Sequence, residues 1–245
     1  AVTIIAAVLT LLCRHTIPGP IPMWAISAPV RGSGKTLLAD CIGIIGTGRP
    51  PAKITPPENE EEARKRIMAL ALAADPIVCV DNIERDFRSG ALSAAITSDE
   101  VRDRLLGRSE MVTAPWRSMV IATGNNLAIR GDLTRRALLI TIDPQTEWPE
   151  DRTGWTHDDL REHVGAHRGA LVSAALTVMR AWIVAGRPIR QNLGAWGSFE
   201  SWSRSIRACV DWALTDPCQG REDLRAADPD HEEHVSLLEA LKHVS

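Results

Sequence analysis

The segment that most constrains this chain is a glycine-rich turn at residues 28–36, which follows the apolar run Met23–Ser27 and precedes a stretch of helical character at Thr36–Ile45. The turn reads Ala-Pro-Val-Arg-Gly-Ser-Gly-Lys-Thr and fits the phosphate-loop pattern except at Ala28, where the pattern has glycine. Glycines let backbone N–H groups turn inward around phosphate oxygens, and a helix that starts there adds its positive end. A strand, a turn and a helix in this order predict a phosphate site.

The last two residues of the turn carry the expected chemistry. Lys35 would reach the β- and γ-phosphates of a nucleotide, and the Thr36 hydroxyl would hold Mg²⁺. A glycine-rich turn with a stray lysine is the alternative interpretation, which the flanking strand and helix disfavour. We therefore predict ATP and Mg²⁺ as cofactors. The residues expected to bind them are Gly32, Ser33, Gly34, Lys35, Thr36 and Leu37.

A second apolar run, Ile77–Val80, ends in the acidic residue Asp81. In open α/β folds ligands bind at the carboxyl ends of the strands, so this carboxylate is expected beside the phosphate turn as a Mg²⁺ residue. An acid that only caps a turn after a strand is the alternative. Glu84 is the candidate catalytic base, although Asn82 could instead orient the attacking water without taking its proton.

Two further runs, Met119–Ala122 and Leu138–Ile142, continue the pattern of strands that alternate with helices. This alternation predicts a parallel α/β sheet flanked by helices. Asn125 follows the first of these runs and could orient the attacking water. Arg135 and Arg136 precede the second run, where an arginine could reach the γ-phosphate held by a neighbouring subunit.

Other helices are predicted from periodicity and end signals. One covers residues 1–13, one is opened by Thr55-Pro56-Pro57, one runs from Leu160 to Trp182, and one is capped by Ser198. The region after Asp143-Pro144 is expected to be all-helical. We predict four parts: 1–22 as an N-terminal helix and linker, 23–145 as the nucleotide-binding core, 146–220 as a C-terminal helical subdomain, and 221–245 as a charged tail.

The order of these motifs resembles the ATPase part of DNA primase-helicases from prophages and integrative elements, which are related to superfamily 3 helicases within the AAA+ ATPases. The resemblance covers about residues 23–143 and again 193–217. It implies an ATP-hydrolysing DNA helicase active in replication, with a P-loop NTPase fold and a hexameric ring that holds ATP between subunits. It also implies Arg136 as the arginine finger, with Arg135 second, while Asn82 stands where most AAA+ proteins have a glutamate.

The segment Val101–Val112 lies where superfamily 3 motors carry a pore hairpin, and Gly107 could form its turn. Arg104, Arg108 and Arg117 are therefore candidates to grip the backbone of single-stranded or forked DNA. Acidic residues interleave with them, so a solvated face or an intersubunit ion-pair face is an equal alternative.

Composition restricts the remaining possibilities. The formal net charge of -3 gives no sign of nucleic-acid binding by itself, and the five cysteines lack metal or redox spacing. The apolar start is too short to span a bilayer, and no basic region precedes it. We expect a cytoplasmic protein without disulfides or membrane contact, and we expect the sequence to be a fragment or domain of a longer polypeptide. We expect no functional role for the surface histidines His157, His163, His167, His231 and His234, or for the core tryptophans Trp182, Trp202 and Trp212.

Two other functions remain open at this point. A nucleotide-gated assembly module would bind ATP, hold a ring or partner, and hydrolyse slowly, and the presence of Asn82 motivates it. A P-loop kinase that acts on a small molecule is a weaker alternative, because the arginine pair suits catalysis between subunits.

Overall fold

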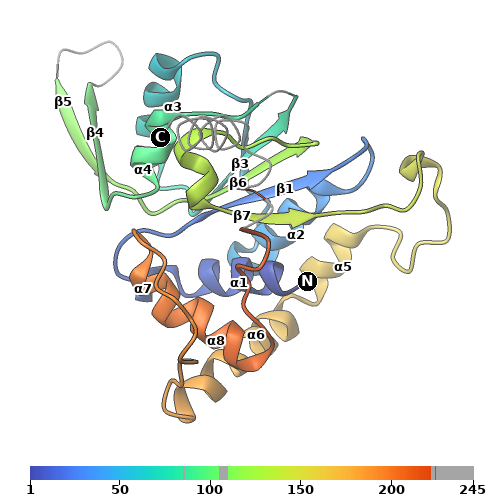
Figure 1. Cartoon of the computed structure of the whole chain (residues 1–245). Helices are drawn as coiled ribbons and strands as arrows, with labels where there is room; N and C mark the ends of the chain where they lie inside the picture. Colours follow the sequence, from blue (N-terminus) through green and yellow to red (C-terminus); the bar gives the residue numbers. More distant parts are fainter. Residues whose placement is uncertain (85, 105–109, 222–223, 225–245) are drawn as a thin grey trace, which may run out of the picture.

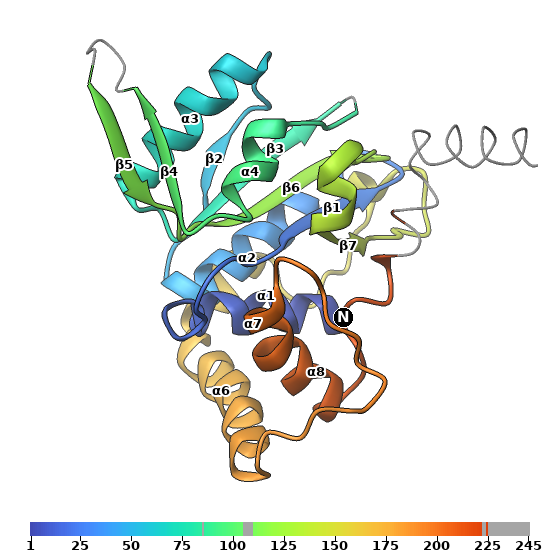
Figure 2. The ribbon, with the colours of Figure 1, turned by 60° about the vertical axis from the view of Figure 1, so that its left-hand side comes forward.

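A five-stranded parallel sheet forms the centre of the protein, seen in a computed structural model that describes residues 1–84, 86–104, 110–221 and 224. The strand order is β2-β3-β6-β1-β7, and every neighbouring pair runs parallel (Figures 1 and 2). The predicted α/β class is therefore correct. The strands are β1 (Met23–Ala28), β2 (Ala52–Ile54), β3 (Ile77–Ile83), β6 (Met119–Asn125) and β7 (Ala137–Thr141).

Alternate residues of the central strands point to opposite faces of the sheet, because side chains alternate along a strand. Trp24 and Ile26 belong to one buried cluster, whereas Met23 and Ala25 belong to the other. Both faces are apolar, which explains why each strand reads as a continuous hydrophobic run.

Helices cover both faces of this sheet (Figure 2). One face carries α3 and α4, and the other carries α1 and α2, with the C-terminal helices packed beneath them. Trp202, which is fully buried, packs edge-on against Trp24 and so joins the C-terminal helices to the sheet. The helices are α1 (Val2–Leu12), α2 (Lys35–Thr47), α3 (Glu60–Ala73), α4 (Gly90–Ala95), α5 (Leu160–Ala166), α6 (Arg168–Val184), α7 (Glu200–Trp202) and α8 (Ala208–Ala213).

Shorter helical turns complete the connections. Three are 3₁₀ turns, η1 (Arg14–Thr16), η2 (Gly131–Arg136) and η3 (Pro149–Asp151), and the fourth is a π-turn, η4 (Ser203–Arg207). The π-turn joins α7 to α8, so these three elements form one continuous helical segment.

An antiparallel hairpin projects from the sheet, in agreement with the predicted hairpin at residues 101–112. Its strands are β4 (Glu100–Arg104) and β5 (Met111–Pro115), drawn at the upper left of Figure 1. Because β5 leads directly into β6, the hairpin is attached at the amino edge of the sheet. Gly107 lies outside the described residues.

Three predicted helix boundaries are wrong. The helix expected at Thr55 starts at Glu60, because the Asn59 side chain accepts the Glu62 N–H and caps it there. The helix expected to run unbroken from Leu160 is divided at His167. Ser198 has a φ of 70° and is no cap, since the helix begins at Glu200, whose carboxylate accepts the Ser198 N–H.

Candidate functional site

The glycine-rich turn joins β1 to α2 at the carboxyl edge of the sheet. Gly32 and Gly34 have φ angles of 73° and 81°, a region that side chains disfavour, so glycine is needed at both positions. The Ser33 hydroxyl donates to the Val30 carbonyl at 2.6 Å and closes the turn on itself. The 13-residue helix α2 starts at Lys35 and presents its N-terminus to the turn. This arrangement suits a phosphate group.

Lys35 lies across the turn and reaches the neighbouring strand. Its Nζ donates to the Asn125 side-chain oxygen at 2.7 Å and to the Val30 carbonyl at 3.1 Å. Partial burial lowers the pKa of Lys35, and the nearby Asp81 carboxylate acts in the opposite direction. Asn125 can be reached because β1 and β6 are paired, with Ala28 opposite Asn125.

Asp81 is fixed by two threonine hydroxyls. Thr36 Oγ1 donates to Asp81 Oδ1 at 2.8 Å, and Thr123 Oγ1 donates to the same oxygen at 2.6 Å. Thr123, which is buried, was not among the predicted site residues. A hydroxyl inside the otherwise apolar strand β6 was the signal that could have identified it.

The backbone around Asp81 is irregular. The pairing of β3 with β6 shifts register between Val80 and Ile83, and Asn82 has a φ of 58°. Asparagine tolerates this left-handed conformation better than glutamate does, which gives a backbone reason for Asn82. The bulge exposes the Asn82 side chain, whose amide donates to Glu84 Oε1 at 3.3 Å. Bulges of this kind often re-aim side chains beside functional sites.

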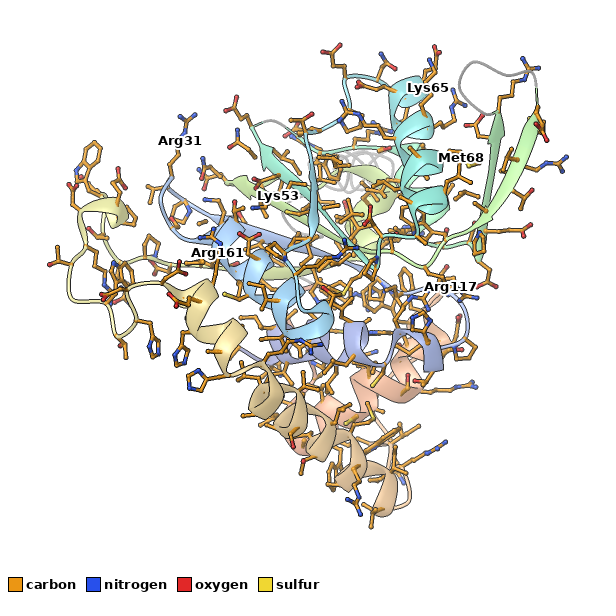
Figure 3. All side chains as sticks on the ribbon, turned by 180° about the vertical axis from the view of Figure 1, so that it is seen from behind. Arg31, Lys53, Lys65, Met68, Arg117 and Arg161 are labelled. Atoms are coloured by element: carbon orange, nitrogen blue, oxygen red, sulfur yellow. The ribbon has the colours of Figure 1, made fainter. Side chains whose placement is uncertain are left out.

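Glu84, the candidate base, lies at the rim of the site. Its carboxylate is 3.5 Å from the Arg31 guanidinium, and the two side chains are 61% and 81% exposed. Figure 3 shows Arg31 pointing away from the body of the protein. At such exposure the ion pair contributes little stability, so both side chains can rearrange when a ligand binds.

These residues surround one cavity of about 510 Å³ at the carboxyl edge of the sheet. The Thr36 hydroxyl and the Asp81 carboxylate are hard oxygen donors 2.8 Å apart, and Mg²⁺ prefers one or two such groups together with phosphate oxygens and waters. The residues present therefore fit Mg²⁺ bound with a nucleotide. All the predicted residues of the turn, Gly32 to Leu37, line this cavity, as do Asp81, Asn82, Glu84, Thr123 and Asn125.

The segment after β7 returns over the phosphate turn, which the sequence did not indicate. A Cβ added to Gly32 would lie 2.7 Å from Glu150 Oε2 and 3.4 Å from the Glu150 backbone nitrogen, so Glu150 lies against the turn. Arg161, at the start of α5, pairs with the buried Asp40 of α2 at 2.8 Å. Lys53 of β2 pairs with the same carboxylate at 3.0 Å, and both basic side chains are labelled in Figure 3.

The two candidate finger arginines have different surroundings. Arg136 donates to the carbonyl and hydroxyl of Ser93 in α4, and its side chain is 20% exposed. Arg135 pairs with Asp132 and is 67% exposed. Both precede β7 at the amino edge of the sheet, so they lie at the opposite edge from the phosphate turn. They line a polar cavity of about 510 Å³ together with Arg207 and Arg221.

The two predicted DNA-contacting arginines that the structure describes, Arg104 and Arg117, lie in different places. Arg104 lies on the exposed face of the hairpin, where Arg102, not predicted, also lies two residues earlier. Arg117 follows the hairpin at its base, where its carbonyl accepts from Arg14 Nε at 3.2 Å. Arg108 lies outside the described residues.

The remaining predictions concern ordinary side chains. His157, His163 and His167 stack in a row at the surface, and within the described residues no three His, Cys, Asp or Glu side chains are arranged to hold a metal. Trp182 and Trp202 are buried as predicted, but Trp212 is 36% exposed, so its assignment to the core is wrong.

The five cysteines are free thiols. No helix in the described ranges is long and apolar enough to cross a membrane. His231 and His234 lie outside those ranges.

No protein-family model and no curated protein sequence matches this chain. Among solved structures, the C-terminal region of NrS-1 in its A-form apo state is similar at 14% identity and a TM-score of 0.41, over 87% of this chain and 67% of that one. JCV helicase is similar at 14% identity and a TM-score of 0.38, over 92% of this chain and 65% of the other. The chain thus spans about two thirds of the length of these structures.

Proposed function

We propose that this chain is a Mg²⁺-dependent ATPase. The observation that carries the proposal is the hydrogen-bonded group of Lys35, Asn125, Thr36, Asp81 and Thr123, which the start of α2 and the neighbouring strands β3 and β6 bring together around one cavity. A cation, a hydroxyl and a carboxylate beside a glycine turn are the groups that a nucleoside triphosphate with its Mg²⁺ requires.

Each residue has a distinct role in this proposal. The backbone of Gly32 to Thr36 cradles the phosphates, and Lys35 leaves Asn125 partly or wholly to contact the β- and γ-phosphates. Thr36 and Asp81 would hold Mg²⁺, and the ion would neutralise charge on the phosphates. Asn125 then orients the attacking water, and Glu84 is the base that accepts its proton. Glu84 is supported by its place on the cavity rim.

The arginines support hydrolysis between subunits. The six-residue strand β1 separates the phosphate turn from the edge that carries Arg135 and Arg136, a distance of roughly 16 Å. An arginine at that edge therefore acts on a nucleotide held by a second copy of the chain, and this geometry requires a closed ring or a filament. We propose a ring, with a hexamer as the assembly that the family resemblance implies.

The hairpin supports a role on nucleic acid. Arg102 and Arg104 lie on its exposed face, and exposed guanidinium groups suit phosphodiester oxygens. Together with the motif order, this favours a motor that translocates along single-stranded or forked DNA, the helicase part of a phage or mobile-element primase-helicase.

A nucleotide-gated assembly switch is the second candidate. The feature that favours it is Asn82, which cannot accept a proton and stands directly after the Mg²⁺ aspartate. In a switch the ring binds ATP tightly and hydrolyses it slowly, because Glu84 is too exposed to hold the attacking water in place.

ATP turnover with and without single-stranded DNA tests the proposal. A motor is expected to hydrolyse faster with DNA, and Lys35→Ala is expected to abolish turnover. Arg135→Ala and Arg136→Ala are measured separately, and loss of the acting finger is expected to slow turnover roughly a thousandfold. Tight ATP binding without turnover under any DNA condition contradicts the motor and favours the switch. No binding of ATP contradicts both.

A further inference from the structure

A second cavity of about 570 Å³ adjoins the phosphate turn. Gly32, Ser33, Gly34 and Leu37 line both this cavity and the one that contains Lys35 and Asp81. The two spaces therefore meet at the turn itself. A ligand whose phosphates occupy the first cavity would extend its other end into the second.

The two helices that line this cavity present mostly apolar side chains, while its polar lining residues come mainly from the segment between β7 and α5. Leu37, Leu38 and Cys41 of α2 line one side, and Leu160 and Val164 of α5 line another. The volume is within the range of pockets that hold small organic ligands, which are typically apolar with a few polar groups. A flat aromatic ring fits such a lining better than a sugar or a phosphate does.

The outer wall comes from the segment between β7 and α5, which holds an aromatic platform. Trp155 lines the cavity, is 56% exposed, and carries the Arg152 guanidinium over its ring at 4.5 Å. Arg152 covers part of the ring, and the exposed remainder is available for stacking. An indole that is left this exposed beside an apolar cavity gains contact area when a planar ligand enters.

The segment that carries Trp155 is held in place at both ends. Glu150 lies against Gly32 of the phosphate turn, and Arg161 pairs with the buried Asp40 of α2. Figure 1 shows this segment at the end of the molecule to which β1 and β7 point. These two contacts, on either side of Trp155 in the chain, keep the segment next to the phosphate turn.

We propose that this cavity binds the purine base of the nucleotide, with Trp155 as the stacking platform. The inference rests on the proposed nucleotide site, since it places the other end of the same ligand. It adds that base recognition depends on the 143–160 segment and on α5, elements to which the motifs assign no role. It also predicts that removing the base weakens binding even when the phosphates are unchanged.

Calorimetric titration with Mg²⁺ and either ADP or inorganic pyrophosphate tests this inference, because the two ligands share a diphosphate and differ in the nucleoside. Trp155→Leu is expected to weaken ADP binding roughly tenfold, the usual effect of losing one base–aromatic stack. Pyrophosphate binding is expected to stay unchanged. Trp148→Leu is the matched control, since Trp148 is 65% exposed on the same segment but does not line the cavity.

The outcomes separate this inference from the proposed function. If Trp155→Leu binds ADP as tightly as the original chain, or loses ADP and pyrophosphate equally, the base pocket is wrong while the phosphate site stands. If Trp148→Leu weakens ADP as strongly as Trp155→Leu, the platform assignment is also wrong. If the original chain binds neither ligand, the nucleotide site itself is overturned, and the base pocket with it.

Discussion

At the scale of single residues, Thr123 has the most specific structural role that no motif indicates. Its hydroxyl donates to Asp81 Oδ1 at 2.6 Å and accepts the Asn82 N–H at 3.2 Å. It therefore fixes both the carboxylate expected to serve Mg²⁺ and the backbone bulge that follows it. Groups that orient a metal-bound carboxylate commonly affect metal affinity tenfold or more.

Thr123→Val keeps the shape of the side chain and removes only the hydroxyl. We expect the Mg²⁺ concentration needed for half-maximal ATP turnover to rise about tenfold, because Asp81 is no longer held in orientation. Thr123→Ser, which restores the hydroxyl, is expected to recover most of the lost affinity. Equal Mg²⁺ dependence in the valine and serine variants would show that Thr123 does not act through Asp81.

Sequence reasoning at this scale can place residues that are close together in the chain. Lys35 and Thr36 are adjacent in the chain, and their place at the turn follows from the glycine spacing. Thr123 lies 87 positions beyond Thr36 and reaches the site because β6 pairs with β3. Glu150 lies 118 positions beyond Gly32 and reaches it because the 143–160 segment returns over the turn. Such contacts depend on the tertiary fold, so no spacing rule indicates them.

At the scale of elements, the contact between α1 and α2 is unusually close. A Cβ added to Gly46 of α2 would lie 2.2 Å from a methyl carbon of Leu11 in α1, which is nearer than any real contact. Leu11 is itself buried, with 6% of its surface exposed, and has little room to move. Glycine at position 46 therefore permits the two helices to pack under the sheet.

Gly46→Ala is expected to lower the free energy of unfolding by about 1–3 kcal/mol, since the added methyl overpacks the interface. Gly165→Ala is the control, because this glycine of α5 has no atom within 4 Å of an added Cβ. That change is expected to stabilise by about 0.5–1 kcal/mol through helix propensity. Denaturant unfolding of both variants measures the difference, and equal effects would contradict the close contact.

The elements themselves were predictable to different degrees. The strands β1, β3, β6 and β7 are buried on both faces and appear as continuous apolar runs. The strand β2 was not predicted, because it has only three residues at the edge of the sheet and contains Lys53. The helix predicted to start at Thr55 starts at Glu60 instead, because Asn59 provides a cap closer to the helix than the signal at Thr55 does.

At the scale of the whole molecule, the sheet separates the two halves of the proposed catalytic machinery. The phosphate turn lies at the carboxyl edge, and Arg135, Arg136 and the hairpin lie at the amino edge. One chain therefore carries the proposed nucleotide site at one edge of the sheet and the two arginines at the other. If the arginines act on a neighbouring copy, as proposed, a complete site requires two copies arranged head to tail, in a closed ring or an open filament.

Mixing two inactive variants tests this arrangement. Lys35→Ala chains lack a working phosphate turn but keep their arginines, whereas Arg135→Ala/Arg136→Ala chains keep the turn and lack the arginines. In mixed rings some interfaces join an intact turn to intact arginines, so we expect ATP turnover to reappear on mixing although each variant alone is inactive. If the arginines acted within their own chain, no mixture would contain a complete site, and turnover would stay absent at every ratio.

Because Arg136 also holds η2 against α4 through Ser93, thermal unfolding of the double variant must first show that it is folded. Turnover that depends on the ratio of the two variants then identifies a site shared between subunits.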